Sequence, residues 1–161
     1  MSVSPIPDPG VLKTADAFLI TAKDMNTYPE SSMMIPAVVN AAFAMELFLK
    51  SLNIEWKLAD VRDEKKAFLA SITARQRGHT PSKLFAGLKP SIREAIEREY
   101  GLVPISEGAV SVVALLEEFD GLFEQWRYAF EGKFKPVDLP RLLATLTFFS
   151  KTINAMPLRW A

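Results

Sequence analysis

Four charged residues stand at spacings that suit chemistry if helices bring them together. Glu46 precedes Lys50 by four residues, and Arg127 precedes Glu131 by four residues, so each pair is one helical turn apart and can form an ion pair. If the two helices pack side by side, we expect all four charges to meet in one polar cluster. An arginine in such a cluster offers a rigid fork of donors that suits phosphate or carboxylate.

Two further polar residues, Asn40 and Tyr128, lie on the same two predicted helices and are expected to flank this cluster. The cluster has two interpretations. In the first it is a structural lock, in which partly buried ion pairs fix the register between the helices. In the second it binds RNA or another phosphate-containing ligand. A further interpretation is that the cluster carries out chemistry. The sequence leaves all of these open, and we favour the lock.

His79 is the one histidine of the chain and stands between Gly78 and the dipeptide Thr80-Pro81. In a structural role, its imidazole would bond a backbone carbonyl or a helix end. In a catalytic role, it would transfer a proton beside Arg127, because imidazole changes its protonation state near neutral pH. RNA cleavage usually needs a second proton-transferring group, and no other histidine can supply it. Arg127 and His79 are therefore candidates for an unconventional catalytic site.

Composition excludes several kinds of site. The chain has no cysteine, so thiolate metal sites, disulfides and cysteine nucleophiles are absent. A single histidine and the lack of a dense carboxylate cluster predict no metal site. The sequence holds no Gly-x-Ser-x-Gly motif, P-loop or dinucleotide-binding glycine pattern, so it predicts neither serine hydrolase chemistry nor a cofactor.

Length and charge are typical of a globular single-domain protein. The chain has 161 residues, of which 49% are hydrophobic and 24% are charged, and its 19 basic residues balance its 19 acidic ones. A zero net charge argues against binding of duplex DNA. The longest apolar stretches fall short of about 18 residues, and the first ten residues lack the basic region of a signal peptide. We therefore expect a cytoplasmic protein without a membrane span.

The elements that would position the polar residues are helices. From Val38 to Leu52, most of the helix circumference is small or apolar, which is typical of a helix at the centre of a bundle. We expect this helix to begin near Ser31 and to continue to about Leu58. The other predicted helices are Val11–Asp24, a short one near 67–72, one from Pro81, Ile92–Tyr100, a long one over Val110–Glu131, and Leu139–Ala155.

This pattern predicts an all-α fold, an up-and-down helical bundle of four main helices plus short helices. Residues 1–9 are expected to form an extended N-terminal lead-in, residues 10–156 a single domain, and residues 157–161 a C-terminal tail. Aromatic residues at helical spacing are predicted to lie in the core or at a dimer interface; they are Phe119, Phe123, Trp126, Phe130, Phe148 and Phe149.

Three segments stand out together: NAAFAMELFLKSL at 40–52, GHTPSKLFAGL at 78–88 and FEQWRYAFEG at 123–132. In order and approximate spacing they resemble the HEPN superfamily, the higher-eukaryote-and-prokaryote nucleotide-binding domain. The matching patterns are Asn-x5-Glu-x3-Lys, Gly-His-x4-Leu and Trp-Arg-Tyr-x-x-Glu, and the resemblance extends over about residues 10–155. It implies a helical bundle that dimerises along two of its helices.

Many HEPN relatives are RNA-cleaving toxins or defence effectors, and others are non-catalytic partners. The ribonucleases carry an Arg-x4–6-His motif, and Arg127 matches its arginine, but the residues from Gly132 onward read Gly-Lys-Phe-Lys-Pro, without the histidine. The resemblance therefore implies a branch without standard ribonuclease action. It also implies a homodimer that works beside a nucleotidyltransferase-type partner protein.

Three hypotheses follow for the function. The first is a binding or regulatory module of a toxin–antitoxin or phage-defence system that contacts RNA or a nucleotide. The second is an unconventional, metal-independent ribonuclease that uses Arg127 and His79. The third is a purely structural dimerisation domain, in which the polar cluster only sets the register of the helices.

Overall fold

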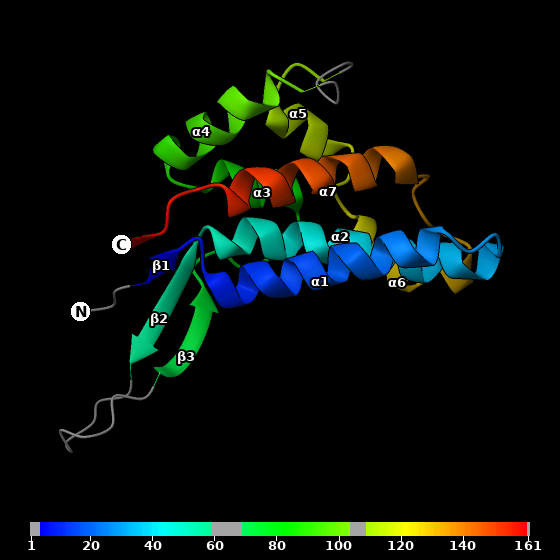
Figure 1. Cartoon of the computed structure of the whole chain (residues 1–161). Coiled ribbons are helices and arrows are strands. Elements are labelled where there is room, and N and C mark those ends of the chain that lie inside the picture. Colours follow the sequence, from blue (N-terminus) through cyan, green and yellow to red (C-terminus); the bar gives the residue numbers. More distant parts are fainter. Residues whose placement is uncertain (1–3, 59–68, 104–108, 161) are drawn as a thin grey trace.

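The computed structural model describes residues 4–58, 69–103 and 109–160. Helices dominate the fold (Figure 1), so the predicted all-α class is confirmed, with small strands added. In chain order the elements are β1 (Pro5–Ile6), α1 (Pro9–Asn26), η1 (Ser31–Met33), α2 (Met34–Ser51), β2 (Ile54–Leu58), β3 (Leu69–Ala74), α3 (Pro81–Ala86), α4 (Pro90–Tyr100), α5 (Val112–Glu117), α6 (Leu122–Arg127), η3 (Ala129–Glu131), α7 (Leu139–Asn154) and β4 (Arg159–Trp160).

α2 is the central helix, as its sequence predicts. It packs against α1, α3, α6 and α7, and Figure 1 shows α1 alongside it and α7 above it. Glycine is absent from α2, which favours a long uninterrupted helix. The stripe of small and apolar residues along it is buried, with Val38, Met45 and Phe48 fully inaccessible to solvent.

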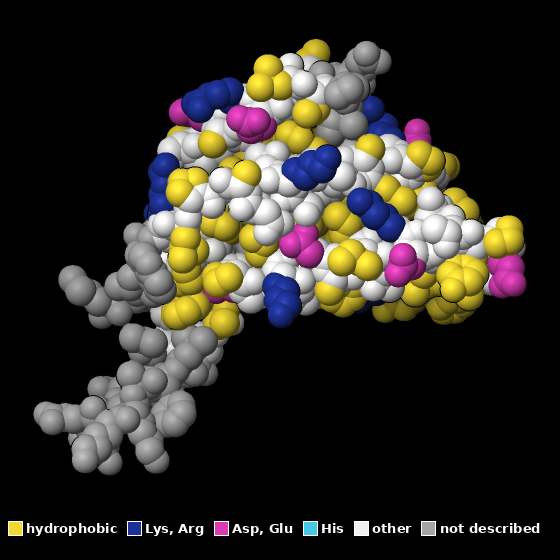
Figure 2. All heavy atoms as spheres, in the orientation of Figure 1, with side chains coloured by type: hydrophobic (Ala, Val, Ile, Leu, Met, Phe, Trp, Pro, Cys, Tyr) yellow, Lys and Arg dark blue, Asp and Glu magenta, His cyan; other side chains and the backbone are white. Residues whose placement is uncertain are grey.

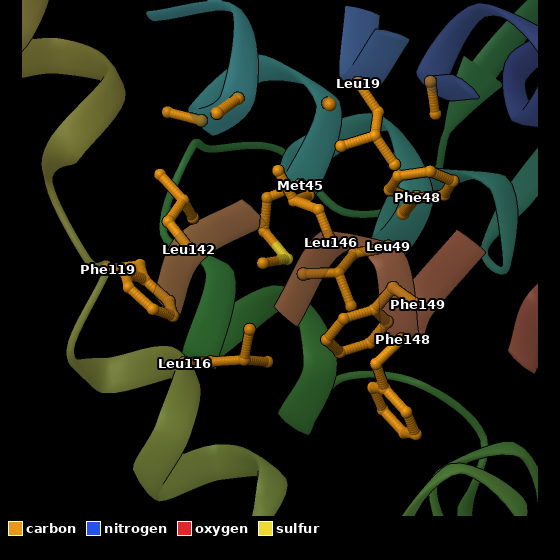
Figure 3. Packing of buried hydrophobic residues seen from close by; sticks show 14 of the residues in the cluster. Leu19, Met45, Phe48, Leu49, Leu116, Phe119, Leu142, Leu146, Phe148 and Phe149 are labelled. Carbon is orange, nitrogen blue, oxygen red and sulfur yellow. The ribbon is translucent and has the colours of Figure 1, made fainter. Parts of the chain in front are cut away.

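The hydrophobic core fills the space between α2, α7 and the shorter helices. Figure 3 shows Met45, Phe48 and Leu49 of α2 beside residues of α7 and of the α5 region. Close packing of this kind leaves few ways to rearrange the helices, so the positions of polar residues on α2 are set by its buried face. The labelled residues from the other elements are Leu19, Leu116, Phe119, Leu142, Leu146, Phe148 and Phe149.

The prediction that the central helix continues to about Leu58 is wrong. α2 ends at Ser51, and the chain turns into strand β2. The reason is a set of contacts with the N-terminal segment: the backbone N–H of Trp56 donates to Ser4 Oγ at 2.9 Å, and its indole Nε1–H donates to Asp8 Oδ2 at 2.8 Å. These partners are some fifty residues away in the sequence, beyond the reach of a local pattern.

β2 pairs with β3 in an antiparallel hairpin, in which Ile54 lies opposite Ala74 and Trp56 opposite Ile72. The short helix predicted near 67–72 is therefore contradicted at positions 69–72, which belong to β3, and its remaining positions lie outside the described residues. Each strand of a two-stranded hairpin is stabilised by pairing with the other strand. Neither strand alone therefore has a sequence pattern that is sufficient to predict it.

The long helix predicted over Val110–Glu131 is divided into α5, α6 and η3. The division occurs at Gly121, whose φ of 80° lies in the left-handed region that glycine adopts most readily. The chain can therefore change direction there, and α6 packs against α2. The final helix, α7, matches its predicted range.

The two ends of the described chain meet. β1 pairs antiparallel with β4, with Pro5 opposite Trp160 and Ile6 opposite Arg159. Near β1, the carboxylate of Asp8 is almost fully buried and caps α1 by accepting from the backbone N–H of Val11 at 2.9 Å. The segments predicted as an extended lead-in and a tail are thus joined to each other by this short ladder.

One stretch of the described chain, Ser31–Ser51, is long and apolar enough to cross a membrane by length and composition, with a mean hydropathy of 1.6 over its best window. Half of that window is buried inside the protein, where α2 forms the centre of the bundle. The core helix of a soluble protein has the same composition, so this stretch is weak evidence for a membrane span.

Candidate functional site

Glu46 is a carboxylate that α2 carries into the protein interior. Its side chain is 4% exposed, and a buried charge is costly unless it is paired. Two partners meet this need: Lys50 Nζ donates to Oε1 at 2.5 Å, and His79 Nδ1 lies 2.7 Å from Oε2. Lys50 comes from the next turn of α2, as the four-residue spacing predicts, whereas His79 comes from a different segment of the chain.

His79 reaches Glu46 because the chain around it is held in place. Gly78, just before it, has a φ of 108° and turns the chain out of β3. Just after it, α3 begins at Pro81, as predicted. The first turn of α3 is fastened by Ser82, whose backbone N–H and hydroxyl both donate to the carboxylate of Asp120, in the α5–α6 turn.

A row of half-buried aromatic rings leads away from His79 across three helices. The His79 ring lies 5.5 Å from the ring of Phe123 on α6. Phe123 stacks on Phe43 of α2 at 5.3 Å, and Phe43 meets Phe18 of α1 edge-on at 4.7 Å. Each of these phenylalanines remains partly exposed, so the row forms part of the protein surface beside the buried carboxylate.

Arg127 does not form the predicted ion pair with Glu131. α6 ends at Arg127, and Tyr128, with φ −112° and ψ 25°, leaves the helical conformation, so the four-residue geometry is lost. The guanidinium instead lies 4.8 Å from the centre of the Phe123 ring and 5.4 Å from that of Tyr128. Arg127 and Glu131 are exposed, and neither forms an ion pair within the described ranges.

Asn40 also lies apart from the predicted cluster. Its side-chain N–H donates to the Pro36 carbonyl at 2.7 Å and lies 3.6 Å from Met25 Sδ, near the end of α1. Tyr128 is 50% exposed and contacts the ring of Phe130. The predicted cluster is thus divided into a buried part on α2 and an exposed part at the end of α6, with a phenylalanine between them.

We call the group that remains together the Glu46 site; it consists of Glu46, Lys50, His79, Phe123 and Arg127. With Nδ1 of the imidazole donating to the carboxylate, Nε2 is its second functional nitrogen, and the His79 side chain is 43% exposed. A base oriented by a third group is the arrangement of many proton-transfer sites. A cation beside an exposed aromatic ring suits the phosphate and base of a nucleotide.

Sequence reasoning missed the contact between Glu46 and His79, which are 33 positions apart. It also placed Phe123 and Phe130 in the core or at a dimer interface; Phe123 is half-buried and packs against the core, and Phe130 is 79% exposed and lies outside the core. The sequence did contain a pattern that indicates this partly exposed apolar face of α2. Val39, Phe43 and Leu47 follow one another at four-residue spacing along α2, outside its fully buried stripe, and all three are half-buried.

Metal binding is not indicated by the described residues, because no group of three or more histidine, aspartate or glutamate side chains lies close enough together there to hold an ion. Comparison with protein-family models, with curated proteins and with solved structures finds no match for this chain. The HEPN resemblance therefore rests on its three sequence segments and stays a hypothesis.

Proposed function

We propose that this protein is a binding module for single-stranded RNA and that the RNA contacts the Glu46 site. The observation that carries the proposal is the partly exposed Phe123 ring, with Arg127 on it and His79 beside it. Single-stranded RNA is held by bases stacked on aromatic rings or arginine planes and by cations at the phosphates. Phe43 and Phe18 extend the ring surface away from the cations.

The electrostatics of the site support the same ligand. Within the Glu46 site, the carboxylate of Glu46 pairs with Lys50, so the exposed charge of this group is that of Arg127. The net charge of the whole chain is zero. We therefore expect local, salt-dependent contact with one or two phosphates rather than the long basic surface that duplex binding requires.

A fluorescence-anisotropy titration with a labelled 12-nucleotide single-stranded RNA tests this proposal. Arg127→Ala and Phe123→Ala are each expected to weaken binding by about five- to tenfold, the effect of losing one phosphate or one stacking contact. Lys13→Ala, which removes an exposed cation from α1, is the matched control and is expected to leave the affinity unchanged. Equal affinity in all three variants would contradict the proposal.

A second candidate function, an unconventional metal-independent ribonuclease, is favoured by the contact between Glu46 and His79. A carboxylate on Nδ1 fixes the ring so that Nε2 can accept or donate a proton, and Arg127 can stabilise the charge on a phosphate. Incubation of the purified protein with labelled RNA separates the two functions. Cleavage that disappears in both His79→Ala and Arg127→Ala supports the ribonuclease, and binding without cleavage supports the module.

The biological setting that we propose follows from the HEPN resemblance. We infer a cytoplasmic regulatory module of a toxin–antitoxin or phage-defence system, which works as a homodimer beside a nucleotidyltransferase-type partner. The start of α2 offers a surface for dimerisation, because Met34 and Ile35 are 43% and 38% exposed. Light scattering of wild-type protein and of Ile35→Glu tests this: a dimer that becomes a monomer in the variant supports the proposal.

The third hypothesis, a purely structural dimerisation domain, makes a different prediction for the same residue. If the Glu46 site only holds helices in register, Arg127→Ala lowers the melting temperature and has no effect on RNA. If the site binds RNA, the same change lowers the RNA affinity and shifts the melting temperature by only a few degrees, within about 4 °C of the wild type, because Arg127 is exposed.

A further inference from the structure

A second surface, separate from the Glu46 site, carries a groove between α4 and α7. Its main cavity has a volume of about 580 Å³ and an apolar floor that includes Val103, Ala144 and Phe148. A neighbouring cavity of about 280 Å³ continues the groove toward β1 and the end of α2. The two cavities share Ala95, Met156 and Pro157, so they adjoin each other.

The rim of this groove is basic. Arg98 and Lys151 line the main cavity, and Lys89 and Arg159 line its continuation, against one carboxylate, Glu99. All five side chains are exposed, and none of them forms an ion pair in the part of the chain that the structure describes. Figure 2 shows charged side chains and apolar patches on the face over α4 and α7.

We propose that this groove binds a single-chain amphiphilic anion, that is, an unbranched hydrocarbon chain with a carboxylate or phosphate head group. The apolar floor suits the chain, and the four cations of the rim suit the head group. A combination of apolar lining with few polar groups, in a volume of several hundred Å³, is typical of small-molecule sites. None of the groove residues belongs to the Glu46 site, so the proposal stands apart from RNA binding.

The size and lining of the groove suit a small ligand. Three alanines line its main cavity: Ala95 from α4, Ala144 from α7, and Ala155, which directly follows α7. A cavity of about 580 Å³ lies within the size range of small-molecule sites. An acyl chain would lie along the apolar lining and place its head group at either basic end.

Calorimetric titration with dodecanoate and with dodecyl phosphate, below their micellar concentrations, tests the proposal. Both anions are expected to bind with one-to-one stoichiometry, and neutral dodecanol is expected to bind at least tenfold more weakly. Binding of dodecanol as tight as that of the anions would overturn the role of the cations. Absence of binding by both anions would overturn the whole proposal.

Two variants locate the site. Arg98→Glu combined with Lys151→Glu reverses two exposed charges without touching the core, and it should weaken anion binding about tenfold or more. Ala95→Trp should abolish binding by filling the point that both cavities share. Lys13→Glu, an equally exposed reversal on α1, is the matched control. If Lys13→Glu lost as much affinity for the anions as the double variant, the attraction would be non-specific, which would contradict the proposal.

The head group can come from a free amphiphile or from a lipid surface, and a sedimentation assay with phosphatidylglycerol vesicles distinguishes these sources. Vesicle binding that requires Arg98 and Lys151, without binding of the two free anions, would assign the basic rim to a membrane surface and overturn the groove as a small-molecule site. Binding of the free anions with no vesicle binding is the result that we expect. Circular dichroism of each variant confirms that it folds.

Discussion

Two pairs of opposite charges in this chain have the same four-residue spacing and different structures. Glu46 and Lys50 lie within the 18-residue helix α2 and form an ion pair at 2.5 Å. Arg127 and Glu131 lie on either side of the point where α6 ends, and they do not pair. Four-residue spacing therefore predicts an ion pair only where the helix is continuous. Because α6 ends at Arg127, the guanidinium does not pair with Glu131 and is free to contact a ligand under the proposed function.

Burial separates the two regions as strongly as pairing does. Glu46 is 3% exposed and holds two partners, whereas Arg127 is exposed and lies on aromatic rings. A buried carboxylate with two charge-assisted contacts contributes to stability when its partners are present. An exposed arginine contributes little to stability, so mutation should lower the free energy of unfolding much more in the first region than in the second.

The largest effect is expected for Glu46→Gln. The variant leaves Lys50 and His79 without the charge that they contact, and we expect the free energy of unfolding to fall by about 2–3 kcal/mol. Urea denaturation followed by circular dichroism measures this. The matched control is Glu131→Gln, which should change stability by less than about 0.5 kcal/mol because the side chain is exposed and unpaired in the described residues. Equal losses in the free energy of unfolding for Glu46→Gln and Glu131→Gln would contradict the proposed difference between the two regions.

The next effect concerns the break between α5 and α6. Gly121→Ala forces a side chain into a backbone with φ of 80° and brings its Cβ within 3.1 Å of the Gln125 amide. We expect a loss of about 1–2 kcal/mol in the free energy of unfolding. Gly101→Ala is the control, because Gly101 has a φ of −61° and its nearest neighbour would be 3.7 Å away. A stable Gly121→Ala protein would mean that α5 and α6 can join.

A smaller effect on stability is expected for Arg127→Ala. An exposed cation over an aromatic ring contributes about 0.5–1 kcal/mol, so thermal unfolding should shift by only a few degrees. Stability and ligand binding should therefore be uncoupled at this residue, in contrast to Glu46. If Arg127→Ala lost as much stability as Glu46→Gln, Arg127 would also have the structural role of holding the helices in register.

The smallest effect near neutral pH comes from Tyr100, which is 3% exposed and donates its hydroxyl to the Ala109 carbonyl at 3.0 Å. Burial raises the pKa of Tyr100 above its ordinary value near 10, because the neutral phenol is favoured inside the protein, and the nearby Glu118 and Glu97 add to the rise while Arg141 opposes it.

The contribution of Tyr100 to stability is therefore full below about pH 10 and is lost as the pH rises through the folded-state pKa. Urea denaturation between pH 8 and pH 11 should show that the free energy of unfolding declines as the pH rises. This decline should be smaller in Tyr100→Phe. Tyr128→Phe is the exposed control and should leave the decline unchanged. An unaltered decline in Tyr100→Phe would contradict the role of its burial.

Local sequence patterns predicted the parts of the fold that depend on helical periodicity. The range of α1, the central position of α2, the start of α3 at Pro81 and the range of α7 all agree with the structure. The hairpin escaped prediction because Trp56 is fixed by Ser4 and Asp8, whose positions a local window does not include. The break at Gly121 was not predicted because a single glycine is compatible with a continuing helix.

The polar residues of the candidate site were predictable, whereas its arrangement and the part played by Phe123 were not. Glu46, Lys50, His79 and Arg127 were all identified from type and spacing, but the sequence assigned His79 to a separate loop. The contact between His79 and Glu46 depends on how α3 docks on α2, which is set by packing and by the bond from Ser82 to Asp120. Contacts of this range follow from the assembled fold alone.

The most direct test of the account is the ¹⁵N NMR spectrum of the imidazole, since His79 is the one histidine in the chain. We predict that the neutral ring carries its proton on Nδ1, where it donates to Glu46, and that added single-stranded RNA shifts the Nε2 signal. Glu46→Gln should remove the preference for the Nδ1 proton. A neutral ring protonated mainly on Nε2 in the wild type, with no shift when RNA is added, would contradict the account.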